Sequence, residues 1–397
     1  MLALRRRRMA AAPPFLRGGF RPFFFGGALW ALAALTLWLF SLAGAVELPA
    51  AMDALAWHRH EMLFGFVGAV IAGFLLTAIP NWTGRLPIAG APLALFAALW
   101  GAGRLAVLLS AEIGHGLAAF LDVAFLLGLA LIAGREVLAA KNRNVPVVGL
   151  VLVLALASAL DHAAMAGRLS DPLLGVRLAI GVITLLICLI GGRIIPSFTR
   201  NWLMKQGEQH ALPTQADRFD LVALAATAAA LLLWVVLPVS ELTAGALLFA
   251  AIAQAARLAR WRGLRTLADP LVLILHVGFA WVPLGLLLLG VSILTPDVPQ
   301  SAAIHALTSG AMASMILAVM TRATLGHTAR ELRADGVTKL LYLLVTLGAA
   351  TRVAAPLEVA HYTVLMQASA LLWGGAFLLF LIRYGPILFA PRLGESR

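Results

Sequence analysis

Residues 57–85 read WHRHEMLFGFVGAVIAGFLLTAIPNWTGR, and this stretch decides the fold class. No charged residue interrupts it between Glu61 and Pro80. An apolar run of about this length crosses the hydrocarbon core of a bilayer, roughly 30 Å thick, as an α-helix. The stretch therefore predicts a transmembrane helix that begins near two histidines, His58 and His60.

Similar runs recur along the whole chain, which is 62% hydrophobic and only 12% charged. Soluble domains carry roughly 25% charged residues, so the composition is typical of a membrane protein. Together with proline-containing breaks, the runs predict an all-α integral membrane protein with about twelve transmembrane helices. The predicted spans are 22–45, 55–79, 92–110, 117–138, 146–166, 173–195, 219–238, 241–258, 270–292, 301–321, 338–355 and 361–385. The predicted breaks are Leu48-Pro49, Ile79-Pro80-Asn81, Asp171-Pro172, Asp269-Pro270 and Thr295-Pro296.

No run of residues between the spans is long enough for a separate soluble domain. Residues 1–397 are therefore predicted to form a single polytopic membrane domain, with a cytoplasmic leader over 1–20 and a helical bundle over 22–385. The leader begins MLALRRRRMA and continues into prolines and glycines, so it lacks the apolar region of a cleaved signal. No fixed-period repeat is obvious.

The distribution of basic residues predicts the orientation of these helices. With a cytoplasmic N-terminus, 25 of the 30 Lys and Arg residues fall on cytoplasmic segments. The five exceptions are Arg59, Arg104, Arg168, Arg177 and Arg352. Positive charge is retained on the inner side of membranes, so both termini are predicted to be cytoplasmic. The net charge of +12 then faces anionic lipid and requires no nucleic-acid partner.

Several common chemistries are excluded by their missing motifs. The single cysteine, Cys188, falls in the middle of a span, so the chain has no disulfide and no CxxC metal site. It also lacks a Walker loop, a GxGxxG dinucleotide motif and a CxxCH motif for covalent haem.

The histidines are the polar residues that point to a site, because ionisable groups inside a membrane are costly and usually functional. Five are predicted near the outer ends of four spans, whereas His276 enters its span from the inner side. Neutral imidazole binds haem iron and copper well. The shared depth of His58, His60 and His305 favours a metal site over simple interfacial hydrogen bonding. The five outer histidines are His58, His60, His162, His305 and His361.

Each of these histidines also has an interfacial interpretation, as a side chain bonded to a neighbouring loop. His361 fits that interpretation better than a ligand role, and His162 fits both. His115 and His210 lie in predicted loops and are expected to face solvent. Glu61 follows His58 by three residues, so on a helix it shares the same face and could accept the second ring hydrogen of His58.

A second set of polar residues is predicted at the inner ends of the sixth and tenth helices. Arg193, Arg200 and Arg322 lie there among threonines and aromatic residues. One interpretation is anchoring by the positive-inside rule. The other is a basic pocket for haem propionates, another anion or a quinol head group.

Four long strings resemble the NnrS family. They are GFRPFF from Gly19, the stretch from Trp57 to Arg85, GGRIIPSFTRNW from Gly191, and HALTSGAMASMILAVMTRATLGHT from His305. HVGFAW from His276 resembles a further signature of the family. The resemblance covers the chain from about residue 18 to 385.

The resemblance implies a bacterial inner-membrane protein with twelve helices, haem and copper, linked to nitric oxide metabolism in denitrification and to defence against nitrosative stress. It carries the metal-ligand role onto His58, His60, His276, His305 and His327. His162 and His361 do not match the family pattern clearly. Because no covalent-attachment motif is present, the haem is expected to be haem b.

Three classes of function remain open. The first is an oxidoreductase like nitric oxide reductase, in which electrons come from a quinol or a small donor protein and Glu61 is the candidate catalytic proton donor. The second is a non-catalytic nitric oxide sensor or carrier, or a protein that handles haem or copper. The third is a transporter, for which the sequence shows no broken helices in matching halves.

Overall fold

The computed structural model describes residues 11–210 and 212–394, and every regular element in these ranges is helical. Twelve of the helices are long and apolar enough to cross a membrane, which confirms the predicted number of spans. The first part of the predicted leader, with Arg5, Arg6, Arg7 and Arg8, lies outside the described residues, as does Arg397.

The first six spans are α2 (Phe20–Leu42), the continuous segment α3 (Ala54–His60), η2 (Glu61–Val67) and α4 (Gly68–Thr83), then α5 (Ala91–Leu108), α7 (His115–Ala139), α8 (Val145–Met165) and α9 (Leu174–Lys205). The last six are α10 (Arg218–Val236), α11 (Glu241–Arg260), α12 (Pro270–Leu294), the segment α13 (Gln300–His305), η4 (Ala306–Met312) and α14 (Ala313–His327), then α15 (Gly336–Ala354) and finally η5 (Val359–His361) with α16 (Tyr362–Phe389). The short helix η1 (Pro14–Leu16) precedes the first span, and α6 (Ser110–Ile113) and η3 (Gly263–Thr266) lie between spans.

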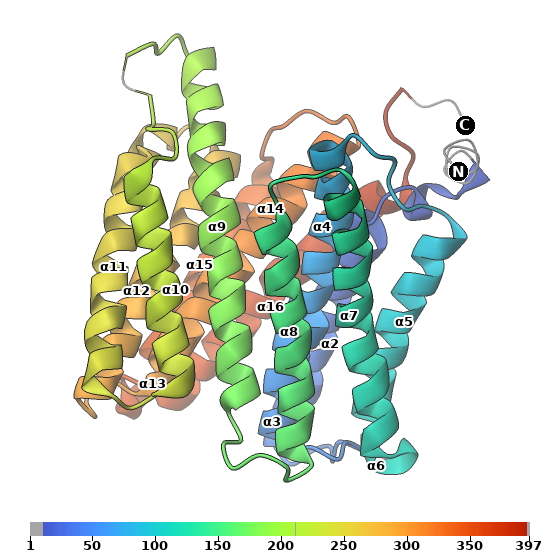
Figure 1. Ribbon diagram of the computed structural model, residues 1–397, viewed down its shortest axis with the longest axis vertical. Helices are drawn as coiled ribbons and strands as arrows, with labels where there is room; N and C mark the ends of the chain where they lie inside the picture. The colour runs from blue at the N-terminus through green and yellow to red at the C-terminus, as the bar shows by residue number, and fades with distance from the viewer. Residues whose placement is uncertain (1–10, 211, 395–397) are drawn as a thin grey trace. The chain divides into compact units, whose positions relative to one another are not determined.

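The chain divides into two compact units. Unit 1 comprises residues 1–182, 323–330 and 380–397. Within it α2 packs on α4, α4 on α7, and α7 on both α5 and α8 (Figure 1). The rings of Phe23, Phe96 and Phe125 meet at its centre, with centroids 5.0–5.8 Å apart.

The first and last described segments meet at one end of unit 1. Arg21, in the first turn of α2, donates to the carbonyl of Leu388 at 2.7 Å. The rings of Phe15 and Phe389 stack with centroids 4.2 Å apart. Helix α6 lies at the opposite end of this unit (Figure 1). Two ends on one side are what an even number of spans requires.

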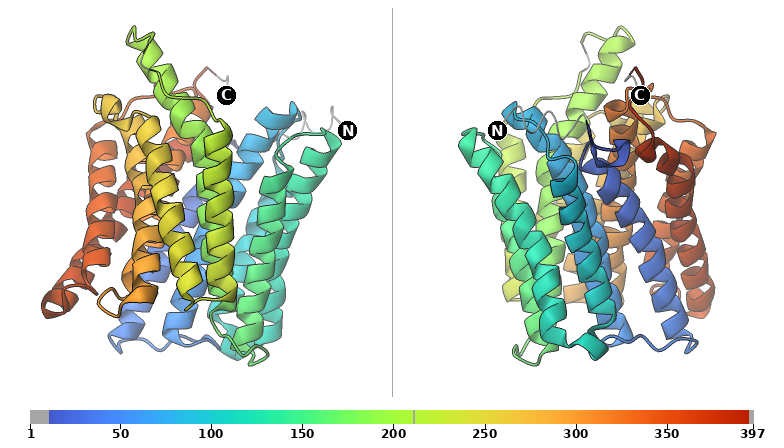
Figure 2. Two further views of the ribbon diagram at one scale, coloured as in Figure 1. Left: turned by 60° about the vertical axis from the view of Figure 1, so that its left-hand side comes forward. Right: turned by 90° about the vertical axis from the view of Figure 1, so that its right-hand side faces the viewer.

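Unit 2 comprises residues 183–322 and 331–379. Helices α10, α11 and α12 lie side by side in it (Figure 2, left). Buried Arg257 on α11 donates to Asp220 on α10 at 2.8 Å and to Gln254 at 3.0 Å. A Cβ atom at Gly192 would collide with the Arg257 guanidinium, so glycine is required there. The buried charge is thus paired within the unit, as the low dielectric demands.

Two prolines expected to mark helix ends lie inside helices instead. The predicted break at Ile79-Pro80 is wrong, because α4 continues to Thr83, and α9 continues past Pro196 to Lys205. Each proline leaves the carbonyl four residues earlier, that of Leu76 or Gly192, without its usual backbone donor, and the helix nevertheless continues. Thr83 donates to the carbonyl of the residue before the first proline at 2.8 Å, and Thr199 does so after the second at 2.9 Å.

Two spans change their helical pitch directly after a histidine. The π-helical segment η2 follows His60, and the π-helical segment η4 follows His305. Short π segments insert one residue into a helix and occur frequently at functional sites. The insertion shifts the faces of all residues that follow it.

Candidate metal centre

Four helical segments of unit 1 bring six ionisable side chains into a buried cluster. The members come from the α3–η2 junction, from α5, from α7 and from α8, and all are at most 4% exposed. Helix α3 begins where Asp53 accepts hydrogen bonds from Leu55 and Ala56, which fixes the turn that ends at His60. The cluster consists of His60, Glu61, Arg104, Asp122, Asp161 and His162.

The ring of His60 lies between two carboxylates. Its Nδ1 is 2.7 Å from Oδ2 of Asp161, and its Nε2 is 3.1 Å from Oδ2 of Asp122. Ionised carboxylates only accept hydrogen bonds, so a neutral ring can satisfy one of the two contacts. With Nδ1 donating to Asp161, the Nε2 lone pair faces Asp122. That contact requires either a proton between the two atoms, carried by the ring or by Asp122, or a cation bound to both.

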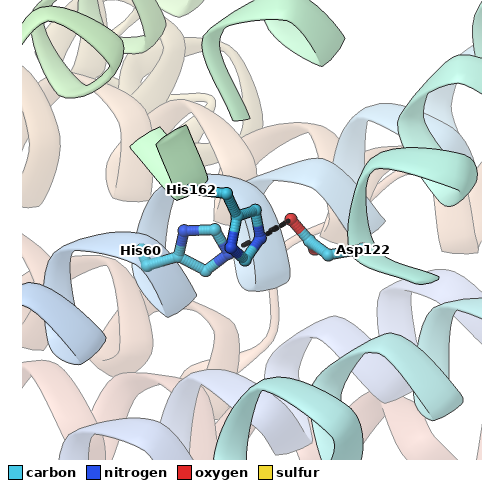
Figure 3. A group of neighbouring side chains, drawn as sticks. All are labelled: His60, Asp122 and His162. Atoms are coloured by element: carbon cyan, nitrogen blue, oxygen red, sulfur yellow. Dashed lines mark hydrogen bonds and ion pairs between the residues drawn. The ribbon is translucent and has the colours of Figure 1, made fainter. Parts of the chain in front are cut away.

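His162 reaches the same oxygen from α8. Its Nε2 is 3.2 Å from Oδ2 of Asp122, and its ring centroid is 4.6 Å from that of His60. Figure 3 shows both rings directed at the Asp122 carboxylate. These three donor atoms lie within 4.8 Å of one another. Atoms that share a four-coordinate metal ion lie about 3 Å apart, and the two distances to Oδ2 of Asp122, 3.1 and 3.2 Å, are close to that spacing.

Asp122 and Glu61 are both held by Arg104. The guanidinium donates to Oε2 of Glu61 at 2.7 Å and to Oδ1 of Asp122. Ser158 donates to the other Asp122 oxygen at 2.6 Å, and Trp30 donates to Glu61 at 2.5 Å. The bonds to Asp122 fix its carboxylate in place without using the ring nitrogens of either histidine.

The cluster carries more negative than positive charge. It contains three carboxylates and one guanidinium, which leaves an excess of negative charge while both imidazoles are neutral. Unbalanced charge is strongly unfavourable in a buried site. A divalent cation, or two additional protons, would restore neutrality. The residues present therefore fit a transition-metal ion.

Gly65 provides the space in which these groups meet. A Cβ atom at this position would collide with the Glu61 carboxylate, the Arg104 guanidinium and the Trp30 indole nitrogen. The π segment places Gly65 against them, and any larger residue would have to displace at least one.

The other histidines predicted in unit 1 lie apart from this cluster. His58 stacks on Trp38 of α2, with ring centroids 4.1 Å apart. Residues two apart on a helix point about 200° away from each other, which explains why His58 and His60 contact different helices. His327 is exposed and lies beside Phe20, with centroids 5.5 Å apart.

In unit 2, the predicted histidines occupy different ends. His276 is buried near the start of α12, and its Nε2 is 2.8 Å from the Thr199 hydroxyl. His305 follows the far end of α12, and its Nδ1 donates to the carbonyl of Ser301 at 2.7 Å. His361 is exposed in η5. The predicted convergence of His305 with His60 involves both units and stays a prediction.

Glu61 and the predicted basic residues have the following surroundings. Glu61 bonds to Trp30 and Arg104, a different environment from the predicted partnership with His58. Arg322 stacks on Phe198, with its guanidinium carbon 4.1 Å from the ring centroid. Arg193 is exposed on α9, and Arg200 is half-buried on the same helix.

The model of the NnrS protein family matches residues 14–392, nearly the whole chain. The chain belongs to the NnrS family. A comparison with curated proteins finds no match. Membership supports a membrane protein related to nitric oxide, in agreement with the twelve candidate spans.

The sequence analysis of this NnrS-family chain missed three members of the cluster. Asp122 is an isolated acid inside an apolar span, which was a usable signal. Arg104 was one of the five exceptions to the charge rule, and its burial between two carboxylates explains the exception. Asp161 directly precedes His162 in the sequence, near the end of an apolar span.

Proposed function

We propose that this protein binds copper at His60, His162 and Asp122, and that together with haem b it binds and reduces nitric oxide in the bacterial inner membrane. The observation that carries the proposal is the approach of both Nε2 atoms to one Asp122 oxygen, with Asp161 behind His60. A carboxylate on the second nitrogen fixes the tautomer of a metal-binding imidazole and raises its basicity.

The residues of the cluster have separate roles in this proposal. Asp161 holds the Nδ1 hydrogen of His60, so that Nε2 presents its lone pair. Arg104 and Ser158 orient Asp122. Glu61, whose Oε2 accepts from Trp30 and Arg104 and whose Oε1 has no hydrogen-bond partner in the described structure, is the candidate proton donor, and it would first have to take up a proton. Copper, when bound, would supply a redox-active centre with affinity for nitric oxide.

His305 is the proposed haem ligand. Its bond to the Ser301 carbonyl places the ring hydrogen on Nδ1, so Nε2 would be the nitrogen that binds haem iron. Arg322 forms no hydrogen bond or ion pair with the rest of the described chain, so with Arg193 and Arg200 it remains the candidate for propionate, anion or quinol binding. His58, His276, His327 and His361 remain candidate ligands of either metal.

Electrons would come from a quinol or a small donor protein, and both termini would be cytoplasmic.

Copper content and electron paramagnetic resonance of the purified full-length protein test the site. We expect one Cu(II) with two nitrogen ligands, reduced to one nitrogen or lost in His60→Ala and His162→Ala. His210→Ala, in an exposed loop of unit 2, is the matched control and should keep the signal. An unchanged two-nitrogen signal in both cluster variants would refute this site.

A second measurement tests the reaction. Anaerobic consumption of nitric oxide with a reduced quinol analogue would support a reductase. Binding of nitric oxide without turnover would instead support a sensor or carrier.

A further inference from the structure

A third histidine, His115, extends the candidate metal centre towards the surface. It is the first residue of α7, after Gly114, whose φ of +93° breaks the helix. The His115 ring centroid is 5.2 Å from that of His162, which is 4.6 Å from that of His60. His115 is half-buried, His162 is 4% exposed and His60 is 0% exposed. Three imidazoles thus lead from the surface to the interior.

The hydrogen bonds determine which ring nitrogens are available along this row. Nε2 of His115 is 3.0 Å from the backbone carbonyl of His162. A carbonyl only accepts, so Nε2 carries the hydrogen and Nδ1 carries the lone pair. Nδ1 of His162 is buried and has no hydrogen-bond partner in the described structure. Two adjacent rings therefore each have one nitrogen that no protein group engages.

The two inner histidines also differ in how firmly they are held. His60 has a carboxylate on its second nitrogen, which strengthens a metal ligand. His162 has no group on Nδ1, so it is the weaker and more exchangeable ligand of the pair. Because no protein group holds Nδ1, His162 is the one of the pair whose ring could rotate and present either nitrogen to an ion.

We propose that His115 and Nδ1 of His162 form an outer, transient metal site, through which copper ions reach His60, His162 and Asp122. This inference rests on the proposed copper site. His115 lies near α6, at the end of unit 1 opposite to the described chain termini (Figure 1). With cytoplasmic termini, the row of imidazoles would take up the ion from the outer side of the membrane.

The test is the rate at which metal-free, full-length protein takes up Cu(II) from a weak chelator. His115→Ala removes the ring, whereas His115→Gln keeps a side-chain donor for the His162 carbonyl but lacks the Nδ1 lone pair. We expect both variants to load at least tenfold more slowly than wild type, and to lose copper to a strong chelator more slowly by a similar factor. At the end point, both should show the two-nitrogen signal of the inner site.

His210→Ala is again the matched control and should load at the wild-type rate. Normal loading in His115→Gln with slow loading in His115→Ala would overturn the inference, because only the bond to the carbonyl would then matter. Normal loading in both variants would also overturn it while leaving the inner copper site intact. If wild type takes up no copper, the proposed function itself fails.

Discussion

The second and tenth spans are built alike. Each consists of a short helix that ends at a histidine, a π-helical segment of seven residues and a longer α-helix. In both, a glycine stands five residues after the histidine and faces a tryptophan of the preceding span. Gly65 lies against Trp30 of α2, and Gly310 lies against Trp281 of α12.

The correspondence extends to the other ends of these spans. Thr83 and Thr328 stand equally far in sequence from His60 and His305. Each donates its hydroxyl to the carbonyl four residues earlier, at 2.8 and 2.6 Å. Thr199 at the end of the sixth span does the same. Threonines elsewhere, such as Thr77, Thr227 and Thr346, make the same kind of bond, so the likeness specific to the second and tenth spans is the histidine, the π segment and the glycine.

The difference between the two spans lies in the residues around the histidine. His60 precedes an acid and is enclosed by carboxylates and a guanidinium, whereas His305 precedes Ala306, is half-buried and bonds to a backbone carbonyl. One backbone arrangement thus presents a histidine to a charged cluster in the second span and a histidine bonded to a backbone carbonyl in the tenth. We therefore expect the stability of the protein to be more sensitive to substitutions around His60 than to substitutions around His305.

Removal of Arg104 should have the largest effect. Arg104→Met leaves Glu61 and Asp122 buried without their shared cation, which typically costs about 3–5 kcal/mol of unfolding free energy. Arg322→Met, in the tenth span itself, is the comparison, and should cost under about 1 kcal/mol because Arg322 has no ion pair in the described structure. Denaturant unfolding in detergent would measure both. Equal losses of unfolding free energy in the two variants would show that the buried cluster around His60 is no more sensitive than the surroundings of Arg322.

Added methyl groups at the two glycines should have the next largest effect. Gly65→Ala and Gly310→Ala should each lower the unfolding free energy by about 1–3 kcal/mol through overpacking. Only Gly65→Ala should also reduce copper content, because only its methyl group meets the charged cluster. Gly149→Ala, in an open position of α8, controls for a helical alanine. Loss of copper in Gly310→Ala would contradict the prediction that only the second span contributes to the copper site.

Asp161→Asn should weaken copper binding by about 10–100-fold, because an amide supports the Nδ1 hydrogen of His60 less well than a carboxylate. Competition with a chelator of known affinity measures the change. In the tenth span, Ser301→Ala should leave the haem spectrum unchanged, because His305 bonds to the backbone of that residue. Unchanged copper affinity in Asp161→Asn would remove Asp161 from the site.

An ion pair outside both spans should show the smallest effect. Asp171, between α8 and α9, accepts hydrogen bonds from Arg177, and these lower the pKa of Asp171 below its ordinary value of 3.8. Because the folded pKa is depressed, the contribution to stability is present above that value and is lost as the pH falls through the folded pKa. The pair is partly exposed, so we expect under about 1 kcal/mol. The unfolding free energies of wild type and Asp171→Asn should therefore converge as the pH is lowered. A difference that grows at low pH would show that the ion pair of Asp171 with Arg177 does not stabilise the fold in this way.

Much of the fold could be predicted because it depends on local properties of the chain. The number of spans follows from the transfer of apolar runs into lipid, which each segment decides by its own composition. The breaks at Asp269-Pro270 and Thr295-Pro296 were predicted correctly, because proline suits a helix start or follows a helix end. The ends of the second and sixth spans were predicted too early, because both helices continue past Pro80 and Pro196.

The sequence by itself determined that this is a membrane protein of twelve spans with histidines near the ends of several of them, and its long motifs indicated the family. Only the tertiary structure showed which histidine meets which acid. Asp122, Asp161 and Arg104 come from three helices, and their meeting with His60 depends on how helix faces pack and on the extra residue of a π segment. Packing angles and helix rotation arise from contacts between distant segments, so no local pattern in the chain encodes them.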